Sequence, residues 1–197
     1  KTLVGIRQND WLKNKTEVCD SYTNSINQAK NEIVIVSSYF LPGRRLNNAI
    51  IGACKRKVKV TLILAGISDV PLIRNATSYL YSLFLKQNVL IYEWNNSVVH
   101  GKAAVVDNKW STIGSFNLND LSCYGSIEMN VEIHSPYFSE LLRSDFQNII
   151  NQCNEVTIDT IYKNTSFISR FVNYMAYRMV RAAILFLTFL PHIRFAK

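Results

Sequence analysis

The chain has 197 residues, of which 48% are hydrophobic and 18% are charged, a composition that excludes an intrinsically disordered protein and fits one folded domain with an appendage. It contains no run of about 20 apolar residues and begins without a signal-peptide pattern, so we expect no conventional transmembrane helix. The net charge is +8, and residues 160–197 hold six Lys or Arg residues and no Asp or Glu. This basic tail indicates an anionic partner, either a lipid or a nucleic acid.

Strands and helices alternate along the first three quarters of the chain. Apolar spacing predicts helices over residues 16–31, 46–57, 72–86 and 136–151, and strands over residues 32–36, 58–64, 89–92 and 127–133. Residues 100–106 and 110–113 are predicted to form a hairpin around a polar turn. Because the connections are short, the alternation predicts an α/β fold in which helices cover a central β-sheet.

The C-terminal segment, residues 156–197, differs in character from the domain predicted over residues 1–155. Residues 167–190 can form one helix whose surface is apolar apart from a narrow polar stripe, made of Arg170, Asn173, Tyr177 and Arg181. Such an amphipathic helix suits the interface of a bilayer. The same pattern also fits a terminal helix that packs on the core or on a partner subunit.

The four cysteines, Cys19, Cys54, Cys123 and Cys153, are too far apart in the sequence to form a C-x-x-C metal or redox motif. A chain of this length can fold without covalent cross-links. We therefore expect four reduced thiols, most of them buried, in a cytoplasmic setting.

One stretch of the chain carries a recognisable set of reactive groups. It reads H-G-K, four residues, D, six residues and G-S-F-N, with fixed positions at His100, Lys102, Asp107, Gly114, Ser115 and Asn117. His100 and Lys102 lie two apart on a predicted strand and should leave the same face, which places a nucleophile or proton carrier beside a cation. Backbone N–H groups at Gly114-Ser115, and the side chains of Ser115 and Asn117, could donate hydrogen bonds to phosphoryl oxygens. These groups fit phosphoryl transfer.

This pattern resembles the H-x-K-x4-D-x6-G-S-x-N motif of the phospholipase D superfamily. The flanks resemble the second catalytic half of bacterial cardiolipin synthases at residues 38–45, 67–69, 118–122 and 128–132, with Asn119 in place of the usual Asp. The resemblance covers residues 15–155. It implies a phospholipase D-like layered sandwich with a central mixed β-sheet flanked by helices, to which the C-terminal segment adds an amphipathic helix.

The resemblance also implies roles for the matched residues. His100 would be the nucleophile or the general acid, in a scheme where one histidine forms a phosphohistidine and a second protonates the leaving alcohol. Glu128 would accept a hydrogen bond from His100 and fix its tautomer, and Asp107, also among the catalytic candidates, would hold the motif loops. Phosphate binding is implied for Lys102, Gly114, Ser115 and Asn117. A path for the lipid headgroup would be lined by Tyr39, Arg44, Arg45 and Asp69. The same four residues could instead be explained by turn formation alone.

No acidic or His/Cys cluster has metal-ligand spacing, so we expect a metal-independent reaction without a cofactor. The implied function is phosphatidyl transfer of the cardiolipin synthase type, on an anionic phospholipid such as phosphatidylglycerol, at the bacterial cytoplasmic membrane surface. The superfamily site needs two motifs, yet neither His134 nor His192 is followed two residues later by Lys. The second motif would therefore come from a longer parent chain or from a homodimer partner. The alternatives are a single-motif homodimeric nuclease or phosphodiesterase acting on nucleic acid, and a non-catalytic membrane-binding module.

Overall fold

The computed structural model describes residues 2–194, and within them all side chains except those of residues 164 and 189–194. A single nine-stranded mixed sheet runs through the molecule in the order β2-β1-β8-β7-β6-β3-β4-β5-β9. Only β3, β4 and β5 pair in parallel, and the other neighbours are antiparallel. The strands are β1 (Leu3–Asp10), β2 (Lys15–Thr16), β3 (Glu32–Ser37), β4 (Lys59–Ala65), β5 (Leu90–Trp94), β6 (Lys102–Val106), β7 (Trp110–Gly114), β8 (Ile127–His134) and β9 (Asn154–Val156).

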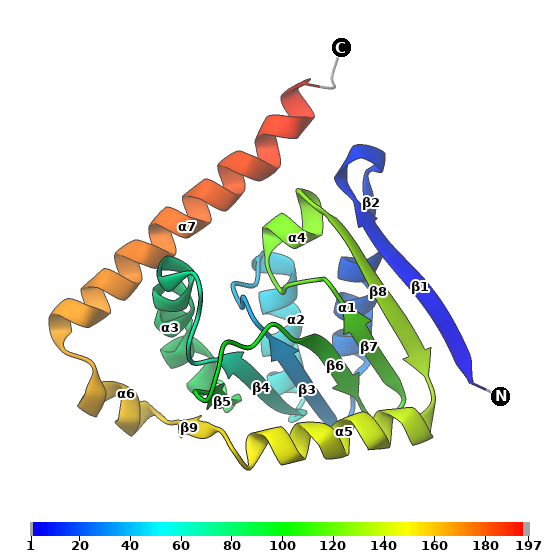
Figure 1. The fold of residues 1–197 in the computed structure, drawn as a ribbon, viewed down its shortest axis with the longest axis horizontal. Helices are drawn as coiled ribbons and strands as arrows, with labels where there is room; N and C mark the ends of the chain where they lie inside the picture. The colour runs from blue at the N-terminus through cyan, green and yellow to red at the C-terminus, as the bar shows by residue number, and fades with distance from the viewer. Residues whose placement is uncertain (1, 195–197) are drawn as a thin grey trace.

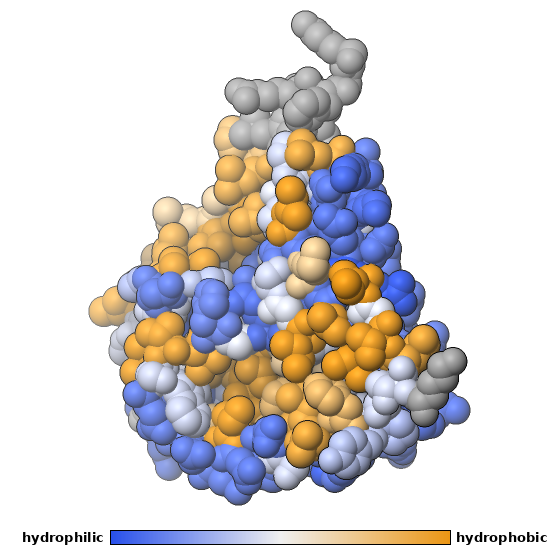
Figure 2. All heavy atoms as spheres, turned by 45° about the vertical axis from the view of Figure 1, so that its right-hand side comes forward, coloured by the Kyte–Doolittle hydropathy of each residue, from blue (hydrophilic) through white to orange (hydrophobic). Residues whose placement is uncertain are grey.

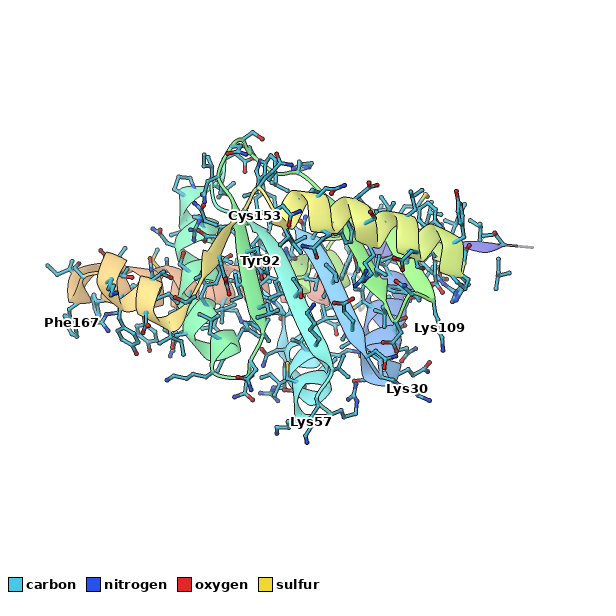
Figure 3. All side chains as sticks on the ribbon, turned by 90° about the horizontal axis from the view of Figure 1, so that it is seen from below. Lys30, Lys57, Tyr92, Lys109, Cys153 and Phe167 are labelled. Carbon is cyan, nitrogen blue, oxygen red and sulfur yellow. A yellow bond between two sulfur atoms is a disulfide. The ribbon has the colours of Figure 1, made fainter. Side chains whose placement is uncertain are left out.

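Helices cover both faces of this sheet, which confirms the α/β layered sandwich (Figures 1 and 3). The helices are η1 (Trp11–Lys13), α1 (Glu17–Gln28), α2 (Arg44–Lys55), α3 (Pro71–Leu85), α4 (Asp120–Tyr124), α5 (Pro136–Ile150), α6 (Ile158–Asn164) and α7 (Phe167–Arg194). The larger core lies between the sheet and α1, α2 and α3, and α7 adds to it. A smaller core lies under α5, where Phe146 packs on Val36 and Ile63. The alternation of strand residues explains the two cores, since Ile35 and Val36 face opposite layers.

Helix α5 covers only part of its face of the sheet. The uncovered part, which we call the open sheet face, consists of Val4, Ile6, Ile113, Ile127, Met129 and Val131, each between 38% and 66% exposed. These residues share one face because Ile6 pairs with Val131, and Val131 pairs with Ile113. Figure 2 shows apolar side chains gathered on this side of the molecule. A continuous apolar patch of this kind marks an interaction surface.

The structure corrects the expected state of two cysteines. Cys19 on α1 and Cys123 on α4 form a disulfide, with their Cα atoms 5.5 Å apart. Cys54 and Cys153 are free and half-buried, and burial raises the pKa of both thiols. The bonded pair is separated by 104 residues, so only the tertiary fold brings the two sulfur atoms together.

Helix α7 begins at the expected residue and packs against α3 and α4 (Figure 1). Ala176, Val180 and Ile184 are buried in the larger core, as expected for a terminal helix that covers the domain. The polar stripe lies beside this packed face, where the Arg181 guanidinium donates to Asp120 at 2.9 Å. None of the helices within residues 2–194 is both long and apolar enough to cross a bilayer.

Candidate active site

The topology brings most of the motif residues to one end of the sheet. Because β6 runs antiparallel to β3, the first residue of β6, Lys102, pairs with Ser37 at the end of β3. The end of β7 lies alongside, since Ala103 pairs with Ile113, and Gly114 pairs with Asn130 near the start of β8. His100, Lys102, Ser115, Asn117 and Glu128 therefore gather where β3 ends and β6 begins.

His100 is exposed at the rim of this site. It precedes β6, so the expectation that it lies on the same strand as Lys102 is wrong. Its ring meets the ring of Tyr39 edge-on, with centroids 6.3 Å apart. The Tyr39 hydroxyl donates to both carboxylate oxygens of Asp69, at 2.7 and 2.9 Å. This hydrogen bond lowers the pKa of Asp69, and the charge interaction with His100 lowers it further. Tyr39 and Asp69 thus belong to the site, whereas Arg45 lies elsewhere, paired with Asp20 on α1.

Lys102 is the buried cation of the site, with only 6% of its surface exposed. Its ammonium group donates to the His100 carbonyl oxygen at 3.2 Å and to the Ser38 hydroxyl at 3.5 Å. Burial lowers the pKa of Lys102, and the carboxylates of Glu128 and Asp69 oppose that shift. A cation held in a fixed position by these partners is suited to binding a phosphoryl oxygen.

Glu128 has different partners from the one the sequence implied. Its carboxylate accepts hydrogen bonds from the hydroxyls of Ser115 and, at 3.0 Å, Ser126, and His100 is not among its partners. The expectation that Glu128 orients His100 is therefore wrong for this structure. Ser115 is fixed as an acceptor as well, because the Met129 backbone N–H donates to its hydroxyl at 3.0 Å.

The motif loop is held by residues that sequence reasoning did not single out. Phe116 is fully buried against Tyr22, with ring centroids 5.3 Å apart, so that Ser115 and Asn117 stay on either side of an anchored residue. Asn130 accepts from the Phe116 backbone N–H at 3.2 Å. The signal for Asn130 is its place in the E-x-N-x-E strand, where alternation turns it inward with the two glutamates.

Gly114 and Ser115 hold the loop in a different way from the one expected. A Cβ at Gly114 would overlap the backbone oxygen of Met129 and the side chain of Asn130, so close strand packing requires glycine here. The Ser115 backbone N–H donates to the Met129 oxygen at 3.0 Å and is not free for a phosphate. In contrast, the side-chain oxygen of Asn117 is buried without a hydrogen-bond partner. This oxygen is an acceptor, so only the NH2 group of the same amide could donate to a phosphoryl oxygen.

Asp107 lies at the opposite end of β6 from the site. Its carboxylate accepts from the backbone N–H groups of Lys30, Asn31 and Glu32 at 2.7–2.9 Å. Burial raises the pKa of Asp107, but these backbone donors outweigh that effect and lower it. Asp107 is therefore a structural residue that fixes the turn before β3. The expectations that it is catalytic and that it holds the motif loops are wrong, because those loops lie at the other end of β6.

A second link joins the site to the loop after β3. The Leu41 backbone N–H donates to the Leu118 oxygen at 3.0 Å, and Leu41 forms a bridge with Asn119. Asn119 caps α4 by accepting from the Ser122 backbone N–H at 2.8 Å. An amide oxygen can accept this capping bond as a carboxylate oxygen can, so Asn at this position is compatible with the start of α4.

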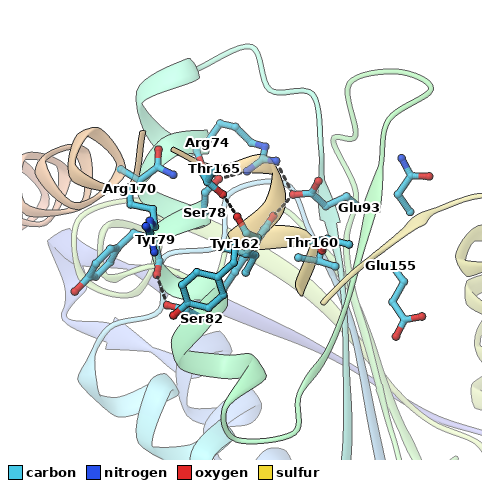
Figure 4. A pocket seen from close by; sticks show the side chains of 15 residues that line it. Arg74, Ser78, Tyr79, Ser82, Glu93, Glu155, Thr160, Tyr162, Thr165 and Arg170 are labelled. Atoms are coloured by element: carbon cyan, nitrogen blue, oxygen red, sulfur yellow. Dashed lines mark hydrogen bonds and ion pairs between the residues drawn. The ribbon is translucent and has the colours of Figure 1, made fainter. Parts of the chain in front are cut away.

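One cavity lies away from the motif residues. It measures about 540 Å³ and is bounded by α3, β5, β9, α6 and α7 (Figure 4). Inside it the Glu93 carboxylate accepts from Arg74 at 2.5 Å and from the Tyr81 hydroxyl at 2.6 Å. The charges of Arg74 and Glu93 are therefore paired with each other. None of the residues that line the cavity belongs to the motif.

A family model described as "Cardiolipin synthase, PLD-like domain" matches residues 22–150. The chain belongs to this family, within the phospholipase D superfamily. It is 36% identical over 157 residues to cardiolipin synthase B of Salmonella typhi, covering 79% of this chain and 38% of that protein. It is 32% identical over 144 residues to the minor cardiolipin synthase ClsB of Bacillus subtilis, covering 73% of this chain and 36% of that protein. The chain thus spans less than two fifths of the length of these relatives.

Solved structures share the fold of this chain at low sequence identity. The family member Nuc from Salmonella typhimurium superposes with a TM-score of 0.68 at 19% identity, over 80% of this chain and 99% of that chain. The phosphatidylserine synthase of Haemophilus influenzae superposes with a TM-score of 0.72 at 17% identity, over 95% of this chain and 47% of that chain. One unit of this fold therefore makes up nearly the whole of the first protein and about half of the second.

Proposed function

We propose that this chain is one catalytic half of a phosphatidyltransferase of the cardiolipin synthase type. The observation that carries the proposal is the gathering of the complete reactive set, an exposed His100 above a buried Lys102 with Ser115 and Asn117 alongside, in a chain 36% identical to a cardiolipin synthase. The substrate would be an anionic phospholipid of the phosphatidylglycerol type.

The proposed chemistry uses two histidines, of which this chain supplies His100. In the first step a nitrogen of one imidazole bonds to phosphorus, the bond to the leaving alkoxide breaks, and the other, protonated imidazole gives its proton to that oxygen. In the second step the acceptor hydroxyl gives its proton to the now neutral imidazole, its oxygen bonds to phosphorus, and the phosphorus–nitrogen bond breaks. Lys102 and the Asn117 amide would hold the non-bridging oxygens.

The second histidine would come from another motif half that docks on the open sheet face. This apolar face borders the site, because Met129 follows Glu128 directly and Ile113 precedes Gly114. Burying its six side chains would close the rim on which His100 is exposed and exclude water from the phosphohistidine. The partner half would be part of the parent chain or a second copy of this chain.

The test is lipid turnover by the chain alone and by its parent reading frame, in phosphatidylglycerol vesicles without divalent metal, followed by mass spectrometry. We expect cardiolipin and glycerol from the parent, a loss of at least about a thousandfold in His100→Ala, and little loss in the matched control His134→Ala. Labelled phospholipid trapped on denatured protein, but not on the His100→Ala variant, would identify His100 as the nucleophile.

Two outcomes would overturn this proposal. Cardiolipin formation that survives the loss of His100 would remove the residue from the reaction. Untouched lipid, together with cleavage of nucleic acid by a dimer of the chain, would establish the single-motif phosphodiesterase instead, a function with which the net charge of +8 is compatible.

A further inference from the structure

Helix α7 has a packed face and, on its opposite side, an apolar face that none of the described residues covers. The packed face holds Ala176, Val180 and Ile184, spaced by four residues, and Tyr177 stacks on Tyr79 of α3 with centroids 4.9 Å apart. We call the uncovered side the outer face of α7. It consists of Phe167, Ile168, Phe171, Val172, Met175, Met179, Leu185 and Phe186, each between 42% and 78% exposed.

The outer face is long and continuous. As far as Met179 its residues recur at spacings of three and four, and Phe186 follows Met179 by seven residues, which is two helical turns, so they lie on one side of the helix. They extend from the first turn of α7 to Phe186. At 1.5 Å per residue this strip is about 30 Å long. In Figure 3 Phe167 lies at the outer edge of the molecule, away from the sheet and its covering helices.

The charges beside the strip are all of one sign. Arg178 is exposed at its margin, next to Tyr174, and Arg170 lies over the Tyr162 ring at the start of the helix. Arg181 is neutralised by Asp120, and from residue 160 onward the sequence contains no acidic residue. A surface with several exposed aromatic and sulfur-containing side chains and a purely basic margin is complementary to anionic lipid rather than to water.

The helix is fixed close to the candidate active site. The bond from Arg181 attaches α7 to Asp120, three residues after Asn117 of the motif. A surface that contacts the outer face would therefore also lie close to the loop that carries Ser115 and Asn117. Since no described helix can span a bilayer, contact with lipid would place α7 in the plane of the interface.

We propose that the outer face of α7 docks the protein on an anionic membrane surface, with its apolar side chains among the acyl chains and Arg170 and Arg178 at the phosphates. The inference is independent of the proposed reaction, because it concerns binding and can be read without turnover. The outer face of α7 is separate from the open sheet face, which lies on β1, β7 and β8. The six residues of the open sheet face are all apolar.

The test is flotation of the full chain with phosphatidylcholine vesicles that contain or lack phosphatidylglycerol. The first variant combines Phe171→Asp, Met175→Asp and Met179→Asp. The matched control places Asp at Leu12, Tyr137 and Leu141, which are exposed apolar residues outside both proposed docking surfaces. We expect the α7 variant to bind more than about tenfold more weakly, while the control binds like the parent. Changing Arg170 and Arg178 to Gln should cost roughly tenfold on phosphatidylglycerol vesicles and little on phosphatidylcholine.

Near-UV circular dichroism establishes that each variant is folded, as expected for substitutions at exposed positions. Unchanged vesicle binding by the folded α7 variant would overturn the proposal, and so would an equal loss in the matched control. A third contrary result is an oligomer that the α7 substitutions dissociate in a protein that never binds vesicles. That result would show that the outer face is covered by another copy of the chain.

Discussion

Replacing Glu132 by Gln should destabilise the protein in a way that depends on pH. The Glu132 carboxylate is only 5% exposed and accepts from Arg7 at 2.7 Å, from the Ser21 hydroxyl at 2.6 Å and from His134 at 2.5 Å. It thereby ties β1, α1 and β8 together. Burial raises the pKa of Glu132, but these three donors outweigh that effect and bring it to about 2 from an ordinary 4.5.

The size of the effect follows from this pKa. A displacement of about 2.5 pKa units corresponds to about 3 kcal/mol of stabilisation at neutral pH. Arg7 and His134 are nearly half exposed, and water screening of those two partners reduces the figure to about 2 kcal/mol. For a chain of this length that loss lowers Tm by roughly 4–8 °C.

The sign of the pH dependence is fixed by the lowered pKa in the folded state. The unfolded chain takes up the proton first as pH falls, so the stabilisation is fully present above about pH 4.5 and is lost on the way to about pH 2. Urea unfolding of the Glu132→Gln variant and the parent should therefore differ by about 2 kcal/mol at pH 7 and by much less at pH 3. The exposed Glu155→Gln serves as a control, expected within about 0.5 kcal/mol at either pH. A constant difference between pH 7 and pH 3 would refute the reasoning.

Three further predictions concern the frame of the site. Asp107→Ala leaves three backbone N–H groups without their acceptor and should lower the unfolding free energy by about 2–3 kcal/mol in urea titrations; a loss of activity with unchanged unfolding would contradict its structural role. Thiol titration of the denatured, unreduced chain should detect only Cys54 and Cys153, and reduction of the disulfide should cost up to about 4.7 kcal/mol for a loop of this length; four reactive thiols would disprove the bond. Gly114→Ala should lower Tm by the equivalent of about 2–3 kcal/mol, because its Cβ overlaps β8; an unchanged Tm would show that β8 can shift.

The central strands and the covering helices of the domain could be predicted from the sequence because their apolar periodicity is strong. Strands β3 and β4 are almost entirely buried, and α1, α2 and α3 each have a regular apolar face. Strands β1 and β9 went unpredicted for physical reasons. The apolar residues of β1 face solvent on the open sheet face, and β9 has three residues, too few to show any period.

The candidate site was predictable in composition but not in geometry. Motif spacing identified His100, Lys102, Ser115 and Asn117, and the structure brings them together. The same spacing could not show that β6 separates Asp107 from them, nor that Ser115 would be the partner of Glu128. A hydrogen-bond partner depends on how loops from distant parts of the chain meet, which a linear pattern does not record. The Cys19–Cys123 bond, closed across 104 residues, was invisible for the same reason.

The ends of the sheet have a consequence for dissecting the protein. The two outermost strands, β2 and β9, have two and three residues, and together with β1 they lie outside the matched family region, residues 22–150. An expression fragment limited to that region would leave the backbone hydrogen-bonding groups of β8 without their partners on β1, along all eight residues. Those of β5 would lose their partners on β9 at the other edge of the sheet. Long unpaired strands recruit other chains, so such a fragment should precipitate, and the limits of sequence similarity are narrower than those of a soluble unit.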